Sequence, residues 1–384
     1  MEEMNTMETQ VKVRRYRLLR RIGIVVLIVL LAMLGAGYAF RYTTYDYVHI
    51  VKNYESESTD NGKYIQYIDG VLEYSRDGIA MLTKEGKELW NQACQMKSPI
   101  VEICNETAAV ADQGGTSIYV FQKNGLKGEI GTTRPIEKIT VSAQGIVAAV
   151  LQDEENPMVM CYDAKGNVLV EHKTSLKNTG YPVDLAISPD GNVLLVSYLC
   201  TKGNGLASKV SYYHFGKAGE DKPDHQVAQK EYSDTIVPTT VFLDKDTSML
   251  VSDHALIFYE GLNEPKEAAV VELDKEIRSV AYNEKYVALV LKNAETDGYE
   301  LRLYRTDGKQ KMTADLDREY SNLKVADGQV LLFEENQCAI FNDAGVCKFQ
   351  GTMEMYVTDI FPVTGFHKYM VINADGFQEI QLAK

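Results

Sequence analysis

Short alternating runs of apolar and polar residues continue along the chain from residue 63 to its end. Turns rich in glycine, aspartate and asparagine separate the runs, a pattern typical of β-strands joined by tight turns. Residues 185–198 show this clearly, because two apolar runs flank the turn SPDG at 188–191. There Ser188 can accept a backbone hydrogen bond, and Asp190-Gly191 completes a tight reversal. The pattern predicts an all-β fold for residues 63–384.

The strand-like runs form a unit that repeats along the chain. One unit consists of a strand, a short turn, an apolar strand, a second turn, an aromatic strand, a glycine turn and a polar strand. The glycine turns of seven units lie 37 to 53 residues apart, at Gly86, Gly125, Gly166, Gly219, Gly261, Gly308 and Gly345. An eighth unit, at 357–382, has three strands. The period matches that of a β-propeller, in which one four-stranded blade takes about 40 to 50 residues.

Eight units predict an eight-bladed β-propeller, with seven blades as the alternative. The eighth unit lacks a fourth strand, and we expect the run KYIQYI at 63–68 to supply it. Closing the ring in this way removes the open sheet edges that would otherwise favour aggregation. Two stacked β-sandwiches form a second alternative, but they do not explain eight units of one period.

An N-terminal transmembrane helix is predicted at 22–40, where 19 consecutive residues carry no charge. This is about the length that a helix needs to cross the hydrocarbon of a bilayer. Six basic residues precede the span, whereas Arg41 alone follows it directly, so the basic segment 1–21 should stay in the cytoplasm. The lipid bilayer is therefore an expected partner of residues 22–40.

The rest of the chain is then expected outside the plasma membrane of a single-pass protein. Residues 41–62 are polar and read as a juxtamembrane stalk, and residues 63–384 form the extracytoplasmic propeller. A secretory signal peptide is the alternative interpretation, because Gly37-Tyr38-Ala39 has the small-x-small form that a signal peptidase accepts.

The charge and the cysteines narrow the classes of partner and scaffold. The net charge is -14, although the first 40 residues are basic, so the propeller is acidic and nucleic acid is not an expected partner. The six cysteines are far apart and form no Cys-x-x-Cys pair, which favours small core residues over a zinc site or a disulfide scaffold. A cross-strand disulfide between Cys338 and Cys347 is the alternative left open.

Two stretches resemble known propeller repeats. SPDGNVLLVSY (188–198) resembles a WD40-type repeat, and KEGKELW (84–90) resembles a quinoprotein-type blade. The whole chain is similar to a family of membrane-anchored bacterial propeller proteins without assigned function, found in Gram-positive anaerobes. The resemblance implies architecture and localisation and transfers no catalytic residue. Quinone enzymes place a tryptophan in most blades, whereas Trp90 stands alone here, so no quinone cofactor is expected.

We predict no catalytic, cofactor-binding or metal-binding residues. No His-Glu-x-x-His motif, Gly-x-Ser-x-Gly elbow or complete calcium loop occurs in the sequence. The six histidines occur singly and without metal-ligand spacing, at His49, His172, His214, His225, His254 and His367.

The sequence thus favours a non-catalytic binding or scaffold module of the cell envelope, with a protein, peptide or glycan partner. Propeller function tends to lie in loops on one face, and the inserts at 200–209 and 216–229 are the best candidates for partner contact.

The alternative function is an envelope hydrolase or lyase with its site at the mouth of the central channel. Such a site needs ionisable side chains that converge at one end of the innermost strands. Five residues on or near those strands are the candidates: Glu102, Asp112, Glu137, Asp184 and Arg278.

Overall fold

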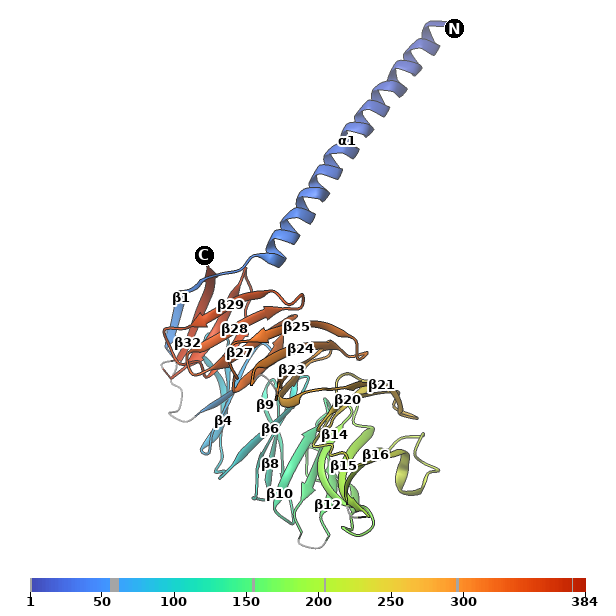
Figure 1. Cartoon of the computed structure of the whole chain (residues 1–384), viewed down its shortest axis with the longest axis vertical. Helices are drawn as coiled ribbons and strands as arrows, with labels where there is room; N and C mark the ends of the chain where they lie inside the picture. Colours follow the sequence, from blue (N-terminus) through green and yellow to red (C-terminus); the bar gives the residue numbers. More distant parts are fainter. Residues whose placement is uncertain (1, 56–61, 154–155, 204, 295–296, 375) are drawn as a thin grey trace.

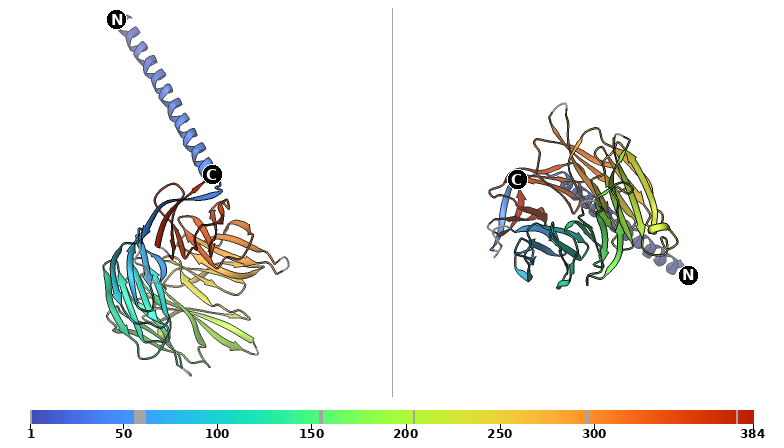
Figure 2. Two further views of the ribbon diagram at one scale, coloured as in Figure 1. Left: turned by 90° about the vertical axis from the view of Figure 1, so that its left-hand side faces the viewer. Right: turned by 90° about the horizontal axis from the view of Figure 1, so that it is seen from below.

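The computed structural model describes the chain except residues 1, 56–61, 154–155, 204, 295–296 and 375, and except the side chains of 2–19, 34 and 36. The described residues form one long helix, α1 (Glu2–Tyr42), and eight four-stranded antiparallel sheets (Figure 1). Figure 2 shows the sheets as blades around a common centre, with successive colours following one another around the ring. The prediction of an eight-bladed propeller is therefore confirmed.

The first four blades follow one another along the chain. Blade 1 contains β2 (Lys63–Tyr67), β3 (Gly70–Tyr74), β4 (Gly78–Thr83) and β5 (Glu88–Ala93). Blade 2 contains β6 (Pro99–Cys104), β7 (Thr107–Asp112), β8 (Ser117–Gln122) and β9 (Gly125–Gly131). Blade 3 contains β10 (Ile136–Val141), β11 (Val147–Leu151), β12 (Met158–Tyr162) and β13 (Val168–Lys173). Blade 4 contains β14 (Tyr181–Ile187), β15 (Val193–Lys202), β16 (Gly205–His214) and β17 (Gln226–Ser233).

The last four blades complete the ring. Blade 5 contains β18 (Thr239–Phe242), β19 (Thr247–Val251), β20 (Ala255–Glu260) and β21 (Lys266–Glu272). Blade 6 contains β22 (Glu276–Tyr282), β23 (Tyr286–Lys292), β24 (Tyr299–Arg305) and β25 (Gln310–Leu316). Blade 7 contains β26 (Asn322–Ala326), β27 (Gln329–Glu334), β28 (Gln337–Asn342) and β29 (Cys347–Thr352). Blade 8 contains β30 (Asp359–Pro362), β31 (Lys368–Asn373), β32 (Gly376–Ala383) and β1 (Tyr47–Glu55).

The strand that closes the ring differs from the one expected. β1, inside the segment predicted as a stalk, pairs along its length with β32, whereas the run at 63–68 opens blade 1. The physical reason is that an outer strand has one solvated face. β1 therefore reads YVHIVKNYE, a mixture of apolar and polar residues similar to that of the outer strands ELWNQA and VLVEHK, and its strand character was missed.

The core lies between the blades, where neighbouring sheets pack face to face. The second strand of each blade is covered on both sides, so β7, β11 and β27 are nearly continuous apolar runs of buried residues. Outer strands such as β5 and β13 instead alternate between exposed and half-buried positions. Each fully buried Val or Leu contributes about 1.5–3 kcal/mol relative to an exposed one, so the stability of the ring comes from these inter-blade layers.

Antiparallel pairing gives the propeller two distinct faces. The first and third turns of every blade lie on one face, and the second turn and the connection to the next blade lie on the other. We call the first the helix face, because α1 ends against two of its turns, and the second the distal face.

Six of the predicted turn glycines have φ between 78° and 107°, as such turns need. Gly219 does not, but a Cβ there would lie 1.9 Å from the carbonyl oxygen of His214.

The end of α1 is held by blades 7 and 8. The buried Lys348 ammonium donates to the carbonyl oxygens of Phe40 and Thr43, both at 2.7 Å, and of Arg41 at 3.4 Å. The Asn342 amide also donates to the Arg41 carbonyl oxygen, at 2.8 Å. The ring of Phe40 stacks on His367, with 4.4 Å between centroids. These contacts satisfy the last carbonyls of the helix and complement its dipole.

The cysteines form no disulfide in the described structure, and all six are free. Cys338 lies opposite Gly351, and Cys347 lies opposite Phe341, so the two cysteines stand at different ends of one strand pair. The alternative of a Cys338–Cys347 disulfide is therefore wrong, because hairpin spacing in the sequence does not fix the register.

Candidate functional site

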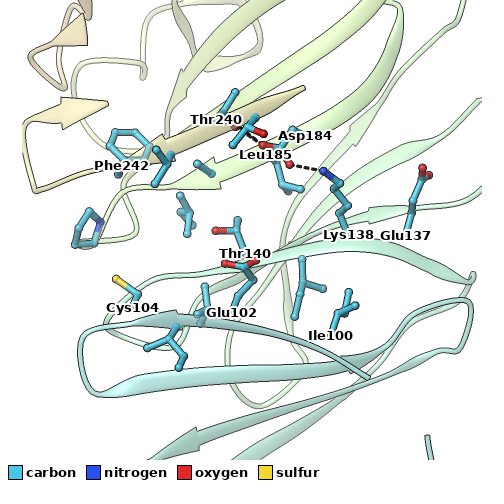
Figure 3. A pocket seen from close by; sticks show the side chains of 18 of the residues that line it. Ile100, Glu102, Cys104, Glu137, Lys138, Thr140, Asp184, Leu185, Thr240 and Phe242 are labelled. Carbon is cyan, nitrogen blue, oxygen red and sulfur yellow. Dashed lines mark hydrogen bonds and ion pairs between the residues drawn. The ribbon is translucent and has the colours of Figure 1, made fainter. Parts of the chain in front are cut away.

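The central channel contains a cavity of about 390 Å³. The innermost strands β6, β10, β14 and β18 form its wall (Figure 3). Tyr282 of β22 also lines it. Inner strands pack closely around the ring axis, so side chains that face the axis from different blades meet in this space. Three of the five residues proposed for the enzymatic alternative line the cavity: Glu102, Glu137 and Asp184.

Asp184 is the most strongly bound of these carboxylates. One oxygen accepts a hydrogen bond from the Lys138 ammonium at 2.7 Å. The other accepts from the backbone N–H of Thr240 at 2.6 Å and from its hydroxyl at 3.1 Å. Asp184 thereby links blades 3, 4 and 5, which is a structural role and leaves the carboxylate little freedom to act as a base.

Glu102 lies across the channel from this cluster, and no cation among the described residues is within ion-pair distance of it. Its side chain is exposed to the water of the channel, yet the channel walls surround it closely. Desolvation by these walls and, to a smaller extent, the charge of Asp184 raise the pKa of Glu102 to about 7, while Lys138 acts in the opposite direction. The phenol of Tyr282 shares this environment, and desolvation, Glu102 and Asp184 all raise its pKa.

The other candidates have structural partners. Glu137 accepts a hydrogen bond from the Tyr181 hydroxyl. Asp112 accepts from the backbone N–H groups of Lys97 and Ser98, at 2.8 and 2.9 Å, and so fixes the connection into blade 2. Arg278 is not among the residues that line the cavity, and its guanidinium pairs with Glu276 and Glu319, both at 2.8 Å.

The chemistry available in the channel is proton transfer by Glu102, with the Lys138 ammonium on the opposite wall of the same cavity. Among the described residues, no group of three or more His, Cys, Asp or Glu side chains could hold a metal ion. Lys138 was missed in the sequence because it follows Glu137 directly. Successive side chains of a strand point to opposite faces of the sheet, which can be predicted from the sequence. The blade that places Asp184 next to Lys138 cannot be predicted from the β10 segment alone.

The two inserts proposed for partner contact lie on opposite faces. The insert at 200–209 is the β15–β16 hairpin, whose turn belongs to the distal face. The insert at 216–229 contains the third turn of blade 4 with the 3-10 helix η1 (Pro223–His225), and it continues into β17 on the helix face. They do not form one contact region.

The β15–β16 hairpin projects from the distal face. Its strands have ten residues each, whereas the equivalent strands of other blades have five to eight. The additional residues extend the hairpin by about 10 Å at ~3.4 Å per residue. The connection 174–180 lies beside it, since the Lys209 ammonium donates to the Asn178 carbonyl oxygen at 2.8 Å.

We call the described residues of these two segments, 174–180, 200–203 and 205–206, the distal ridge. It exposes two large apolar side chains, Leu176 at 48% and Leu206 at 47%. Lys177 and Lys202 are exposed next to them, and Lys202 pairs with Glu231 at 2.7 Å. Exposed leucines surrounded by charged residues on a projecting surface are typical of a protein-contact site.

A sequence model of the DUF5711 family, a family of unknown function, matches residues 41–382 of the chain. No curated protein sequence is a significant match. The family match begins at the end of the helix and includes β1, in agreement with the observed closure of the ring.

Solved structures that are similar to this chain have very different sequences. BamB from Moraxella catarrhalis is similar with a TM-score of 0.53 at 11% identity, over 88% of this chain and 98% of that chain. A eukaryotic initiation factor gives 0.49 at 10% identity, over 80% and 92%. Hsv2p from Kluyveromyces lactis gives 0.48 at 8% identity, over 76% and 98%. At 11% identity the likeness to BamB shows the fold alone.

Proposed function

The chain belongs to the DUF5711 family of unknown function, and we propose that it is a single-pass membrane protein displaying its propeller as a protein-binding scaffold of the cell envelope. The observation that carries this proposal is the distal ridge, a projection with two exposed leucines on the face opposite the anchor. The channel offers no comparable feature, because Asp184 and Glu137 are engaged in contacts between blades.

The anchor in this proposal is the apolar part of α1, Arg20–Tyr42, which is long and apolar enough to cross a membrane. A cleaved signal peptide passes the same test of length and composition. Retention is favoured by the length of the apolar run, 19 uncharged residues at 22–40, and by the long basic segment before it. The basic flank before the span supports a cytoplasmic N-terminus and an extracytoplasmic propeller.

The test is site-specific photocrosslinking in native membranes. A photoreactive amino acid is placed at Leu206 on the distal ridge and, as a matched control, at Lys217 on the helix-face insert of the same blade. We expect Leu206 to trap one defined envelope protein that Lys217 does not trap. The variant Leu176→Asp, which keeps the fold because the residue is exposed, should abolish the product.

Purified partner and propeller should then bind each other directly, with a weaker affinity for Leu176→Asp. If crosslinkers at several distal positions return only bulk lipid and abundant bystander proteins, the scaffold proposal is wrong.

A second candidate, an envelope hydrolase or lyase, is supported by Glu102. A carboxyl with a pKa of about 7 on the wall of a channel cavity is suited to general acid–base catalysis. The test is a screen of envelope glycans and peptides with the purified protein, repeated with Glu102→Gln. An activity lost in that variant, while the crosslinked partner at Leu206 is retained, would favour the enzyme. An activity that Glu102→Gln leaves unchanged would contradict it.

A further inference from the structure

The outer end of the transmembrane helix can be placed in the bilayer by its length. Residues 22–40 span about 28 Å at ~1.5 Å per residue, close to the ~30 Å thickness of the hydrocarbon. Phe40 then lies at the boundary between hydrocarbon and headgroups on the propeller side. Whatever side chain of the propeller touches Phe40 must lie at nearly the same depth.

The first turn of blade 8 supplies such a side chain. Phe366 is the most exposed large apolar residue among those the structure describes, at 75%, and its ring makes an edge contact with Phe40 at 5.8 Å between centroids. His367 beside it stacks on Phe40 and also contacts Tyr45 at 4.6 Å. An exposed aromatic ring so close to the end of an apolar helix is suited to the headgroup layer, where amphipathic and aromatic side chains concentrate.

The position of this turn relative to the helix is fixed on several sides. Besides the three Lys348 contacts, the Arg41 guanidinium pairs with Asp343 at 3.1 Å. The backbone N–H of Tyr45 donates to the Lys348 carbonyl oxygen at 2.8 Å, directly before β1 enters the sheet. The residues between α1 and β1 are therefore held by contacts with blades 7 and 8 and do not form a free stalk.

We propose that the helix face of blade 8, centred on Phe366, rests in the headgroup layer of the bilayer and that the propeller stands on the membrane in one orientation. Figure 1 and the left view of Figure 2 show the consequence: blade 8 lies beside the end of the helix, and blades 3 and 4 lie at the far end of the molecule.

The contact depends on aromatic insertion and little on charge. The basic groups near Phe366 are already paired, Arg41 with Asp343 and Lys368 with Glu379 at 2.6 Å. Few unpaired cations remain there to attract anionic lipid, so zwitterionic phosphatidylcholine is sufficient as the bilayer.

The test uses tryptophan fluorescence of the full-length protein in phosphatidylcholine vesicles whose acyl chains carry bromine, a short-range quencher. The parent protein contains Trp90 alone and gives the baseline. Phe366→Trp adds a tryptophan on the helix face, and Tyr356→Trp adds one at a residue 68% exposed on the distal face. Both added side chains are at exposed positions, so both variants should fold.

We expect brominated lipid to cause a loss of the emission added by Phe366→Trp, with a blue-shifted maximum, and to leave the emission added by Tyr356→Trp unchanged. Equal quenching of the two, or none at Phe366→Trp, overturns the proposal. Circular dichroism verifies the fold of each variant. Because no partner protein is present, this outcome is independent of the crosslinking at Leu206.

Discussion

Lys348 allows a quantitative test of the contact between helix and propeller. The side chain is 4% exposed and directs its ammonium at three carbonyl oxygens at the end of α1. Lys348→Met keeps most of the apolar stem and removes the donor. Burial lowers the pKa of this lysine, so part of the gain from its hydrogen bonds is offset by desolvation.

The size of the effect follows from the geometry. Hydrogen bonds to charged groups contribute about 1.5–3 kcal/mol each, and two of the three contacts are short, at 2.7 Å. After the cost of burying an ammonium, we expect a net loss of about 2 kcal/mol, located at the helix end because β1 and β32 remain paired. A change of 2 kcal/mol raises the population of the locally open state about 30-fold.

The assay is limited trypsin digestion of the protein in vesicles. Cleavage at Arg41 releases the propeller, and mass spectrometry measures the rate of this release. The wild-type site is protected, because its guanidinium pairs with Asp343 and its carbonyl accepts from Asn342. Lys311→Met is the matched control, since Lys311 lies 3.6 Å from Asp343 and makes no contact with the helix carbonyls. Equal release rates for Lys348→Met and wild type would refute the reasoning.

Three further predictions concern the channel and the closing strand. Because the pKa of Glu102 is raised, the folded state keeps a proton on this carboxyl that the unfolded state loses near pH 4.5. The free energy of unfolding measured in urea should therefore fall as the pH rises from 4.5 toward 7, and the fall should be smaller in Glu102→Gln. Asp184→Ala should lower the free energy of unfolding by about 1–3 kcal/mol, measured by urea denaturation, because the backbone N–H of Thr240 and the Lys138 ammonium lose their partner. A truncated protein that starts at residue 43 keeps β1 and should remain monomeric in size-exclusion chromatography. One that starts at residue 63 lacks β1 and should aggregate through the uncovered edge of β32. Monomers in both cases would contradict closure of the ring by β1.

Much of the fold could be predicted because a propeller repeats its local signals. The turn glycines, the apolar second strands and the blade period are all properties of short segments, and eight such units determine the architecture. The turn at 188–191 also behaves as expected: the Val193 N–H donates to the Ser188 hydroxyl oxygen at 2.9 Å, and Gly191 has a φ of 72°. Neither depends on a distant part of the chain.

The features that were missed depend on distant parts of the chain. β1 and β32 pair across more than 300 residues, and an outer strand has too few apolar residues to be recognised alone. The sequence around Lys348 reads as an ordinary outer strand, because its partners are carbonyl groups that any residue carries. In the channel, Glu102, Glu137 and Asp184 were correctly placed on inner strands. The partners of Glu137 and Asp184, which are Tyr181, Lys138 and Thr240, come from other blades.

The two faces of the ring give the proposals a common geometry. The distal ridge contains the second turn of blade 4, whereas Phe366 lies on the first turn of blade 8. Antiparallel pairing places first and second turns on opposite faces of the ring, whatever the tilt of the blades. If contacts at the helix face keep blade 8 at the bilayer, a partner bound by the ridge on blade 4 is held across the ring from the membrane. A mobile stalk would permit many distances to the membrane, whereas the Lys348 contacts permit few. The trypsin assay on Lys348→Met and the crosslinking at Leu206 therefore test two parts of one arrangement. The Lys348→Met substitution should loosen the orientation of the propeller on the membrane without abolishing partner binding at the distal ridge.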